Sequence, residues 1–410
     1  MNYLKKININ FLIALIIPFL IWGPFFPDLI ISLSSLLFLI YLFKKKKFNY
    51  FNKKPIIIFF IFCIYCILIS LLFAKNTLFS LQSSLFYFRI GVFACLIWHL
   101  VELDKKILKY FYYALIICFS ALIVDGYIQF FFGTNIIGLP KSGSRISSFF
   151  GDELIMGSYL SRLSPFLFAL FFLKKKKKLQ LNFISIYFFL LTSLIFISGE
   201  RAAFFLYSLS LIFIIIFIDK LKKFKIIILA LYLFSIAVMS LNFHEVRNRM
   251  IQSTVDSFSS SILPSGHESL IKTSYKMILD KPIFGHGPKM FRVLCKEEKY
   301  ISKIGTCENH SHNFYVQLLA ETGIVGFSFL FSAFAYVLYC AYRQLKSIVL
   351  RQKRYLTDYQ VCLLAGILIT VWPLTTNGNF FNNWLMIVYS LPVGFYLHSI
   401  YGKNRGNISF

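Results

Sequence analysis

Long runs of hydrophobic residues alternate with short polar gaps along most of the chain. The runs approach the roughly 20 residues that a helix needs to cross a bilayer, and a backbone inside lipid must form its hydrogen bonds internally. The pattern therefore predicts an all-α, polytopic membrane protein with about twelve transmembrane helices. The expected spans are residues 9–26, 28–43, 55–73, 85–101, 110–131, 154–173, 182–198, 202–218, 226–242, 314–340, 359–375 and 384–400.

One long polar interval interrupts this pattern before the tenth expected span, and it is long enough for a small helical subdomain. We therefore expect three parts: a membrane region with nine spans at 1–242, the loop subdomain at 243–313, and a membrane region with three spans at 314–410. The sequence turns apolar directly after Asn313, which predicts that a membrane helix begins there.

Composition excludes a soluble globular protein. The 410 residues are 58% hydrophobic and 19% aromatic, whereas roughly half apolar is the norm for soluble chains. The first apolar run follows Lys5 and Lys6, and no small-residue cleavage site comes after it. This arrangement predicts an uncleaved signal anchor rather than a signal peptide that is removed.

A net charge of +26 would point to nucleic acid in a soluble protein. Here the basic residues gather in gaps between apolar runs, as the positive-inside rule predicts for cytoplasmic loops beside anionic membrane lipids. We therefore expect no nucleic-acid partner, both termini in the cytoplasm, and the polar interval on the opposite face. The basic gaps are 44–54, 105–109, 174–178, 220–225 and 343–354.

Four arginines in the outer half of the expected topology are candidates for a site. They are Arg89, Arg145, Arg162 and Arg201. Ionisable side chains at membrane depth are costly and generally functional, and the planar guanidinium group matches phosphate and stays charged. An anionic ligand is one interpretation. The other is that each arginine pairs with a nearby acid and ties helices together. Arg145 and Arg201, in Gly- and Ser-rich turns, fit the ligand better.

His312 is the candidate general base. It precedes the expected helix, whose dipole disfavours a positively charged ring, and a neutral imidazole can accept a proton. Four polar residues near the start of this helix are spaced three or four apart: His310, Asn313, Gln317 and Glu321. We therefore expect them on one helix face beside a cavity. A structural hydrogen-bonding role for the histidines is the alternative, and zinc would need further ligands at a recognisable spacing.

Two other features of the polar interval have a physical interpretation. Pro282, Gly285 and Gly287 mark a turn whose glycines permit a close backbone approach, and its amides could bind a phosphate or a sugar. Cys295 and Cys307 lie outside the cytoplasm in the expected topology, where an oxidising compartment permits a disulfide between them.

These motifs together resemble the O-antigen ligase and polymerase superfamily. The resemblance rests on His310-Ser311-His312-Asn313-Phe314-Tyr315, the segment from Glu321 to Gly326, the turn at 282–287, the segment 145–151, and the turn at 198–201. The resemblance implies a GT-C-like membrane fold and an inverting, metal-independent glycosyltransferase without a cofactor. Its substrates would be a glycan on undecaprenyl diphosphate and lipid A–core oligosaccharide, met at the periplasmic face of the bacterial inner membrane.

Carried over to this chain, the resemblance implies that Arg145 and Arg201 hold the diphosphate and that His312 is the base. Members of the superfamily often have an arginine where this chain reads Ser265-Gly266-His267-Glu268, so Arg247, Arg249 or Arg292 are the candidates to replace it. An O-antigen ligase is the favoured reading. An O-antigen polymerase and a protein O-oligosaccharyltransferase would use the same donor, and a lipid-linked sugar transporter is the non-enzymatic alternative.

Overall fold

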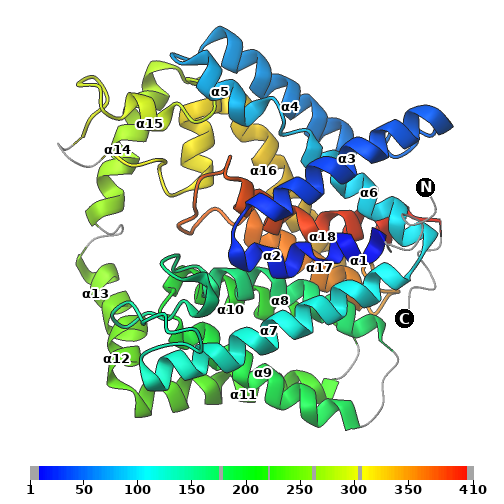
Figure 1. The fold of residues 1–410 in the computed structure, drawn as a ribbon, viewed down its shortest axis with the longest axis vertical. Coiled ribbons are helices and arrows are strands. Elements are labelled where there is room, and N and C mark those ends of the chain that lie inside the picture. The colour runs from blue at the N-terminus through cyan, green and yellow to red at the C-terminus, as the bar shows by residue number, and fades with distance from the viewer. Residues whose placement is uncertain (1–8, 175–178, 220–221, 261–264, 303–306, 404–410) are drawn as a thin grey trace.

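The computed structural model describes residues 9–174, 179–219, 222–260, 265–302 and 307–403, and they fold into a layered bundle of helices (Figure 1). The helices are α1 (Ile9–Ala14), α2 (Ile16–Trp22), α3 (Phe25–Lys45), α4 (Lys54–Leu72), α5 (Thr77–Ser84), α6 (Arg89–Leu103), α7 (Lys106–Phe132), the 3-10 turn η2 (Ser148–Phe150), α8 (Met156–Leu173), α9 (Leu179–Ile197), α10 (Arg201–Phe217), α11 (Lys222–Asn242), α12 (His244–Arg247), the π-helical segment η3 (Asn248–Gln252), α13 (Ser253–Ser260), α14 (Ser265–Asp280), α15 (Phe291–Leu294), α16 (Phe314–Val349), α17 (Asp358–Thr370) and α18 (Asn383–Tyr401).

The prediction of an all-α polytopic membrane protein is confirmed. Among the described residues, eight helices are long and apolar enough to span a membrane, and four shorter apolar helices fall on the remaining expected spans. Within the described ranges there is no strand, and the β-type pairing consists of two isolated bridges, Thr134 with Pro140 and Ser142 with Arg145.

Several helix boundaries differ from the expected spans because local breakers act inside apolar runs. The first run is divided into α1 and α2 and ends at Trp22, before Gly23 with φ of 125°. The eleventh ends at Thr370, before Trp372 and Pro373. Helix α16 begins after Asn313 as expected but continues to Val349, with a non-helical residue at Gly323.

The described basic gaps and both ends of the described chain gather at one end of the bundle. Asn10 donates to Asp104, and the backbone amide of Lys403 donates to Glu102, so the first and last described helices both reach the end of α6. Lys53 lies over the ring of Tyr401 nearby. The expected clusters at Lys5, Lys6, 175–178 and 220–221 lie outside the described residues.

The polar interval runs along the opposite side of the bundle, at the left in Figure 1. Its first helices, α12 and α13 with η3, lie beside α11. Its later helices, α14 and α15, form a second small core around Met277, Phe291 and Leu294, which also includes Ala320 of α16. The division into three domains stays a prediction.

The turn at 282–287 is packed against the break in α16. The backbone amide of Ile324 donates to Pro282 O, and the amides of His286 and Gly287 donate to the carbonyls of Ala320 and Glu321. A Cβ atom on Gly323 would lie 2.1 Å from Ile283 O, so glycine is required there to let the two backbones meet. The turn and the helix break therefore form one locked unit that joins the polar interval to α16.

Replacing Gly323 with alanine should destabilise the folded protein by more than the roughly 1–2 kcal/mol that a left-handed residue costs, because the added carbon also meets backbone. Gly138→Ala is the matched control, since Gly138 also has a positive φ but has open space around its Cβ position. Thermal unfolding of both variants in detergent measures the difference. Equal melting temperatures would contradict the locked unit.

Candidate active site

The loop that carries Arg145 is held by polar side chains of α7. Asp125 accepts hydrogen bonds from Asn135 Nδ2 at 3.2 Å, from the amide of Ile136 at 2.9 Å and from Ser148 Oγ at 2.5 Å. Gln129 accepts the backbone amides of Ser147 and Ser148 at 3.0 and 2.7 Å. These contacts fix the segment on either side of Arg145 to a membrane helix.

Arg145 lies against the tight turn between α9 and α10. Its Cγ is so close to Gly199 that a Cβ there would approach it to 2.9 Å, and its Nη2 donates to Leu154 O at 2.7 Å. Burial lowers the pKa of Arg145, the carboxylate of Glu200 opposes this shift, and the charge of Arg249 adds to it. Arg145 is thus a half-buried cation beside one acid and a second cation.

Arg201 and Arg249 complete this group. Arg201 Nη1 donates to Ser253 O at 2.7 Å, and Arg249 Nε donates to Gly199 O at 3.2 Å. The positive charge of Arg249 acts on both Arg145 and Arg201. We call Arg145, Arg201 and Arg249 the arginine cluster. Among the three arginines that the sequence offered as a replacement, the fold brings Arg249 to Arg145 and Arg201.

Glu200 connects the arginine cluster to α8. Its carboxylate accepts the backbone amides of Gly157 and Ser158 at 2.6 and 3.1 Å, and the hydroxyl of Ser158 at 2.7 Å. A negative charge at a helix N-terminus is stabilised by the free amides and by the helix dipole. The turn that carries Arg201 is therefore fixed to the first residues of α8.

Arg162 continues the connection from α8 to the histidines. Its Nη2 donates to Asn377 Oδ1 at 2.8 Å, and its guanidinium lies 4.4 Å from the ring centroid of Tyr389. The backbone of Asn377 in turn donates to His312 O at 2.8 Å, and its carbonyl lies 3.3 Å from His310 Nε2. Arg162 thus ties helices and loops together, as the helix-tying alternative expects, and its role in holding the donor stays a prediction.

Arg89 forms an ion pair with an acid on another helix. Its Nη2 lies 2.5 Å from Asp28 Oδ1, and its Nη1 donates to Ser32, both on α3. This ion pair joins α6 to α3, so Arg89 is held by a different part of the bundle from the arginine cluster. The helix-tying alternative is the one that the contacts of Arg89 support.

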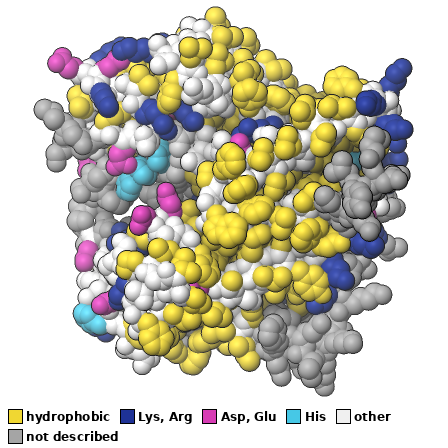
Figure 2. All heavy atoms as spheres, in the orientation of Figure 1, with side chains coloured by type: hydrophobic (Ala, Val, Ile, Leu, Met, Phe, Trp, Pro, Cys, Tyr) yellow, Lys and Arg dark blue, Asp and Glu magenta, His cyan; other side chains and the backbone are white. Residues whose placement is uncertain are grey.

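His312 sits directly before the cap of α16 in a left-handed conformation, with φ of 57°. Its Nε2 lies 2.5 Å from a carboxylate oxygen of Glu308. The rings of His310 and His267 flank it, with centroids 4.1 and 4.7 Å away. We call these three histidines and Glu308 the histidine cluster. Figure 2 shows histidine side chains beside a hollow on the left of this face of the molecule.

The two flanking rings favour the neutral form. Burial lowers the pKa of His310 to about 4, the charge of His312 lowers it further, and its bond to Asn377 O opposes the shift. Burial also lowers the pKa of His267, with His312 in the same direction and Glu308 against it. At neutral pH both flanking rings are therefore uncharged, and Glu308 supplies the nearest charge to His312.

The polar residues of α16 meet other protein groups. The side chain of Asn313 caps the helix by accepting the amides of Tyr315 and Val316. Gln317 and Glu321 are fully buried, and Gln317 donates to both Glu321 and Asn379. Gln317 and Glu321 therefore bond to other groups of the protein, whereas His310 and Asn313 are partly exposed, and the cavity beside this stripe stays a prediction.

The amides of the 282–287 turn bond to the protein itself. The amides of His286 and Gly287 donate to carbonyls of α16, and the amide of Gly285 donates to Lys281 O. These bonds hold the turn against the protein, and its contact with a phosphate or a sugar stays a prediction. Gly285 still needs to be glycine, because a Cβ would lie 2.4 Å from the backbone of Glu321.

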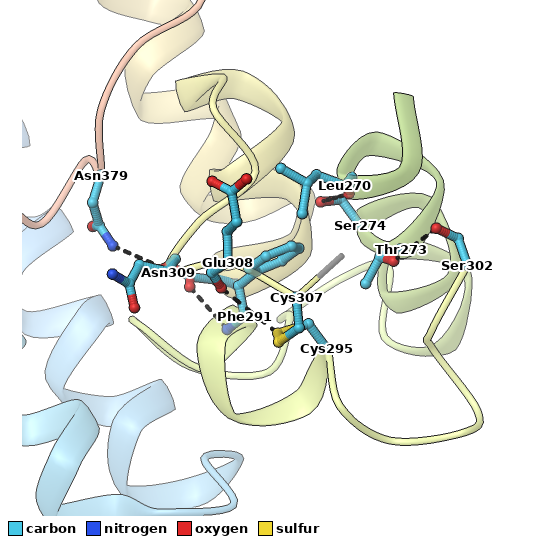
Figure 3. The surroundings of a disulfide bond; sticks show 11 residues. Leu270, Thr273, Ser274, Phe291, Cys295, Ser302, Cys307, Glu308, Asn309 and Asn379 are labelled. Carbon is cyan, nitrogen blue, oxygen red and sulfur yellow. Dashed lines mark hydrogen bonds between the residues drawn. A yellow bond between two sulfur atoms is a disulfide. The ribbon is translucent and has the colours of Figure 1, made fainter. Parts of the chain in front are cut away.

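Cys295 and Cys307 are joined by a disulfide, with Cα atoms 5.4 Å apart (Figure 3). It attaches the start of the segment 307–313 to the end of α15. The sequence analysis did not single out Glu308 or Asn377, although both are polar residues near motifs that it named. An acid four residues before a candidate base is the signal that could have identified Glu308.

The fold and this site define a polytopic α-helical membrane protein with an arginine cluster and a histidine cluster at neighbouring loops. Residues 186–331 match the model of a protein family described as O-antigen ligase. Over these residues the match confirms the resemblance to the O-antigen ligase and polymerase superfamily. No curated protein matches the chain.

Replacing Asn377 with alanine removes the acceptor for Arg162 and leaves part of a buried guanidinium without a partner. We expect this variant to lose about 1–3 kcal/mol of stability. Asn377→Asp, which keeps an oxygen acceptor for Arg162, should retain most of the melting temperature. A thermal-shift comparison in detergent checks the order, and equal loss in both variants would contradict it.

Proposed function

We propose that the protein is an inverting glycosyltransferase that moves a glycan from undecaprenyl diphosphate to a hydroxyl of lipid A–core oligosaccharide at the periplasmic face of the inner membrane. The family match supports the class of enzyme. The structural observation that carries the proposal is the series of contacts from Glu200 through α8 and Arg162 to Asn377 and His312.

This series connects the two clusters through α8. Gly157, bonded to Glu200, and Arg162, bonded to Asn377, are five residues apart on α8. At 1.5 Å per residue the two contacts begin roughly 8 Å apart along the helix axis. This spacing supports a single substrate that meets the arginine cluster with its diphosphate and the histidine cluster with its first sugar.

In the proposed reaction the arginine cluster stabilises the leaving group. An oxygen of the acceptor hydroxyl attacks the anomeric carbon, and the bond from that carbon to the diphosphate oxygen breaks with its electron pair. The diphosphate gains negative charge as it leaves, and fixed guanidinium groups can neutralise that charge without rearranging. The charge of Arg249 acts on both Arg145 and Arg201, and this repulsion would decrease once a diphosphate is bound.

His312 accepts the proton of the acceptor hydroxyl in this proposal. With its Nε2–H donated to Glu308, the other ring nitrogen, Nδ1, carries the free lone pair. Glu308 then stabilises the imidazolium that forms. The enzyme must also orient the reacting groups. Buried helices and capped turns hold the catalytic side chains in place before the substrate binds.

His312→Ala should abolish transfer while the protein stays folded. General-base catalysis contributes about 10²–10⁴-fold, and the acceptor proton then has no partner. The experiment complements a deletion strain: wild type should restore glycan on lipopolysaccharide, whereas His312→Ala should leave lipid-linked polymer accumulating. Full restoration by the variant would refute the base. A deletion strain whose core carries single repeat units would indicate an O-antigen polymerase instead of a ligase.

Arg145→Lys should reduce transfer severely, because lysine keeps the charge and loses the bidentate geometry that phosphate recognition uses. Arg89→Lys is the matched control, since Arg89 pairs with Asp28 on α3 and lysine can keep that ion pair. Initial rates with a synthetic undecaprenyl diphosphate glycan measure both variants. Comparable rates for the two would argue that Arg145 does not hold the diphosphate.

A further inference from the structure

The contact between Glu308 and His312 depends on the path of a loop. The two residues are four apart, a spacing that brings side chains together on an α-helix. Here no helix joins them, and His312 itself has a left-handed φ of 57°. The 2.5 Å separation of Nε2 and the carboxylate oxygen therefore has to be imposed by whatever holds the backbone on each side.

The contact with His312 contributes little free energy by itself, because the Glu308 side chain is exposed. It is 55% exposed, and exposed ion pairs contribute about 0–1 kcal/mol because water competes and side-chain freedom is lost. A free loop would leave the carboxylate solvated for much of the time. A persistent contact needs Glu308 to be placed in advance, so that little conformational freedom remains to be lost.

The disulfide provides that placement. Cys307 directly precedes Glu308, and its bond to Cys295 fixes it to the end of α15. Cys295 is 1% exposed, and its sulfur lies 3.7 Å from Glu308 O. On the other side, Asn309 O accepts a hydrogen bond from Asn379 Nδ2 at 3.4 Å. Figure 3 shows these contacts on both sides of Glu308.

The anchor is itself tied to the helix that His312 precedes. Phe291, at the start of α15, is fully buried, and its backbone amide donates to Glu321 Oε1 of α16 at 3.0 Å. Helix α16 begins two residues after His312. His312 and Glu308 are therefore both fixed relative to α16. His312 lies at the start of that helix, and Glu308 is attached to it through α15 and the disulfide.

We infer that Glu308 is a positioning residue for His312 and that the Cys295–Cys307 disulfide keeps it there. This inference rests on the proposed function. Glu308 selects the ring form with hydrogen on Nε2 and stabilises the protonated ring, and without the disulfide its carboxylate leaves the ring for solvent. The other groups that face His312 are the His310 and His267 rings, and the charge of Arg292 acts on His310.

The test uses the full-length protein in detergent, with an undecaprenyl diphosphate glycan as donor and lipid A–core as acceptor. Glu308→Gln should lower kcat about tenfold or more with little change in KM, because orientation of the base acts on the chemical step. Replacing Cys295 and Cys307 together with serine should give a similar loss. Glu298→Gln, an exposed carboxylate of the same segment, is the control and should keep wild-type activity.

The combined variant decides whether the disulfide acts through Glu308. If it does, the triple variant Glu308→Gln, Cys295→Ser, Cys307→Ser is no slower than Glu308→Gln alone. Each of these variants should lower kcat and leave KM near the wild-type value, as expected for a group that orients the base. Mild reduction of the wild type repeats the test without substitutions: it should slow the wild type and leave Glu308→Gln unchanged.

Wild-type activity of the double cysteine variant, or losses that multiply in the triple variant, would overturn the inference. The His312→Ala variant distinguishes failure of this inference from failure of the proposed function. If His312→Ala is inactive and the cysteine variants are normal, the function stands and the positioning role falls. If His312→Ala is active, the base assignment itself is wrong.

Discussion

The carboxylate of Glu200 is the group on which the arrangement of this site depends. It is 8% exposed, and a buried carboxylate is tolerated only when hydrogen bonds and opposite charge replace its water. Three donors at the start of α8 and the cation of Arg145 do this here. The contacts that satisfy this one buried charge therefore fix three elements relative to one another: the α9–α10 turn, the loop of Arg145 and the N-terminus of α8.

The same requirement extends across the bundle to the histidines. Arg162 is buried and must find acceptors, and it finds the side chain of Asn377, whose backbone binds the loop of His310 and His312. Such groups are expensive at membrane depth unless they are paired. The contacts that satisfy them also fix the loops at the helix ends, and preorganised cations and a held base are what a transfer from a diphosphate needs.

The sequence predicts the helices well and the long-range contacts poorly. Apolar runs placed the spans, and the change of pattern at Asn313 placed the start of α16, because both depend on neighbouring residues. The spacing of Gln317 and Glu321 predicts the face they share but not their partners, because Asn379 comes from a distant segment. Asn377 and Arg249 reach the site from distant segments. Their partners, His312 and Gly199, are known only once the chain has folded.

The central claim is that the arginine cluster and His312 act on one substrate molecule. A structure of the protein with a bound undecaprenyl diphosphate glycan tests it most directly. The account predicts that the diphosphate contacts the guanidinium groups of Arg145 and Arg201 while the first sugar faces His312. A diphosphate bound away from these arginines, or a sugar that the imidazole cannot reach, would contradict it.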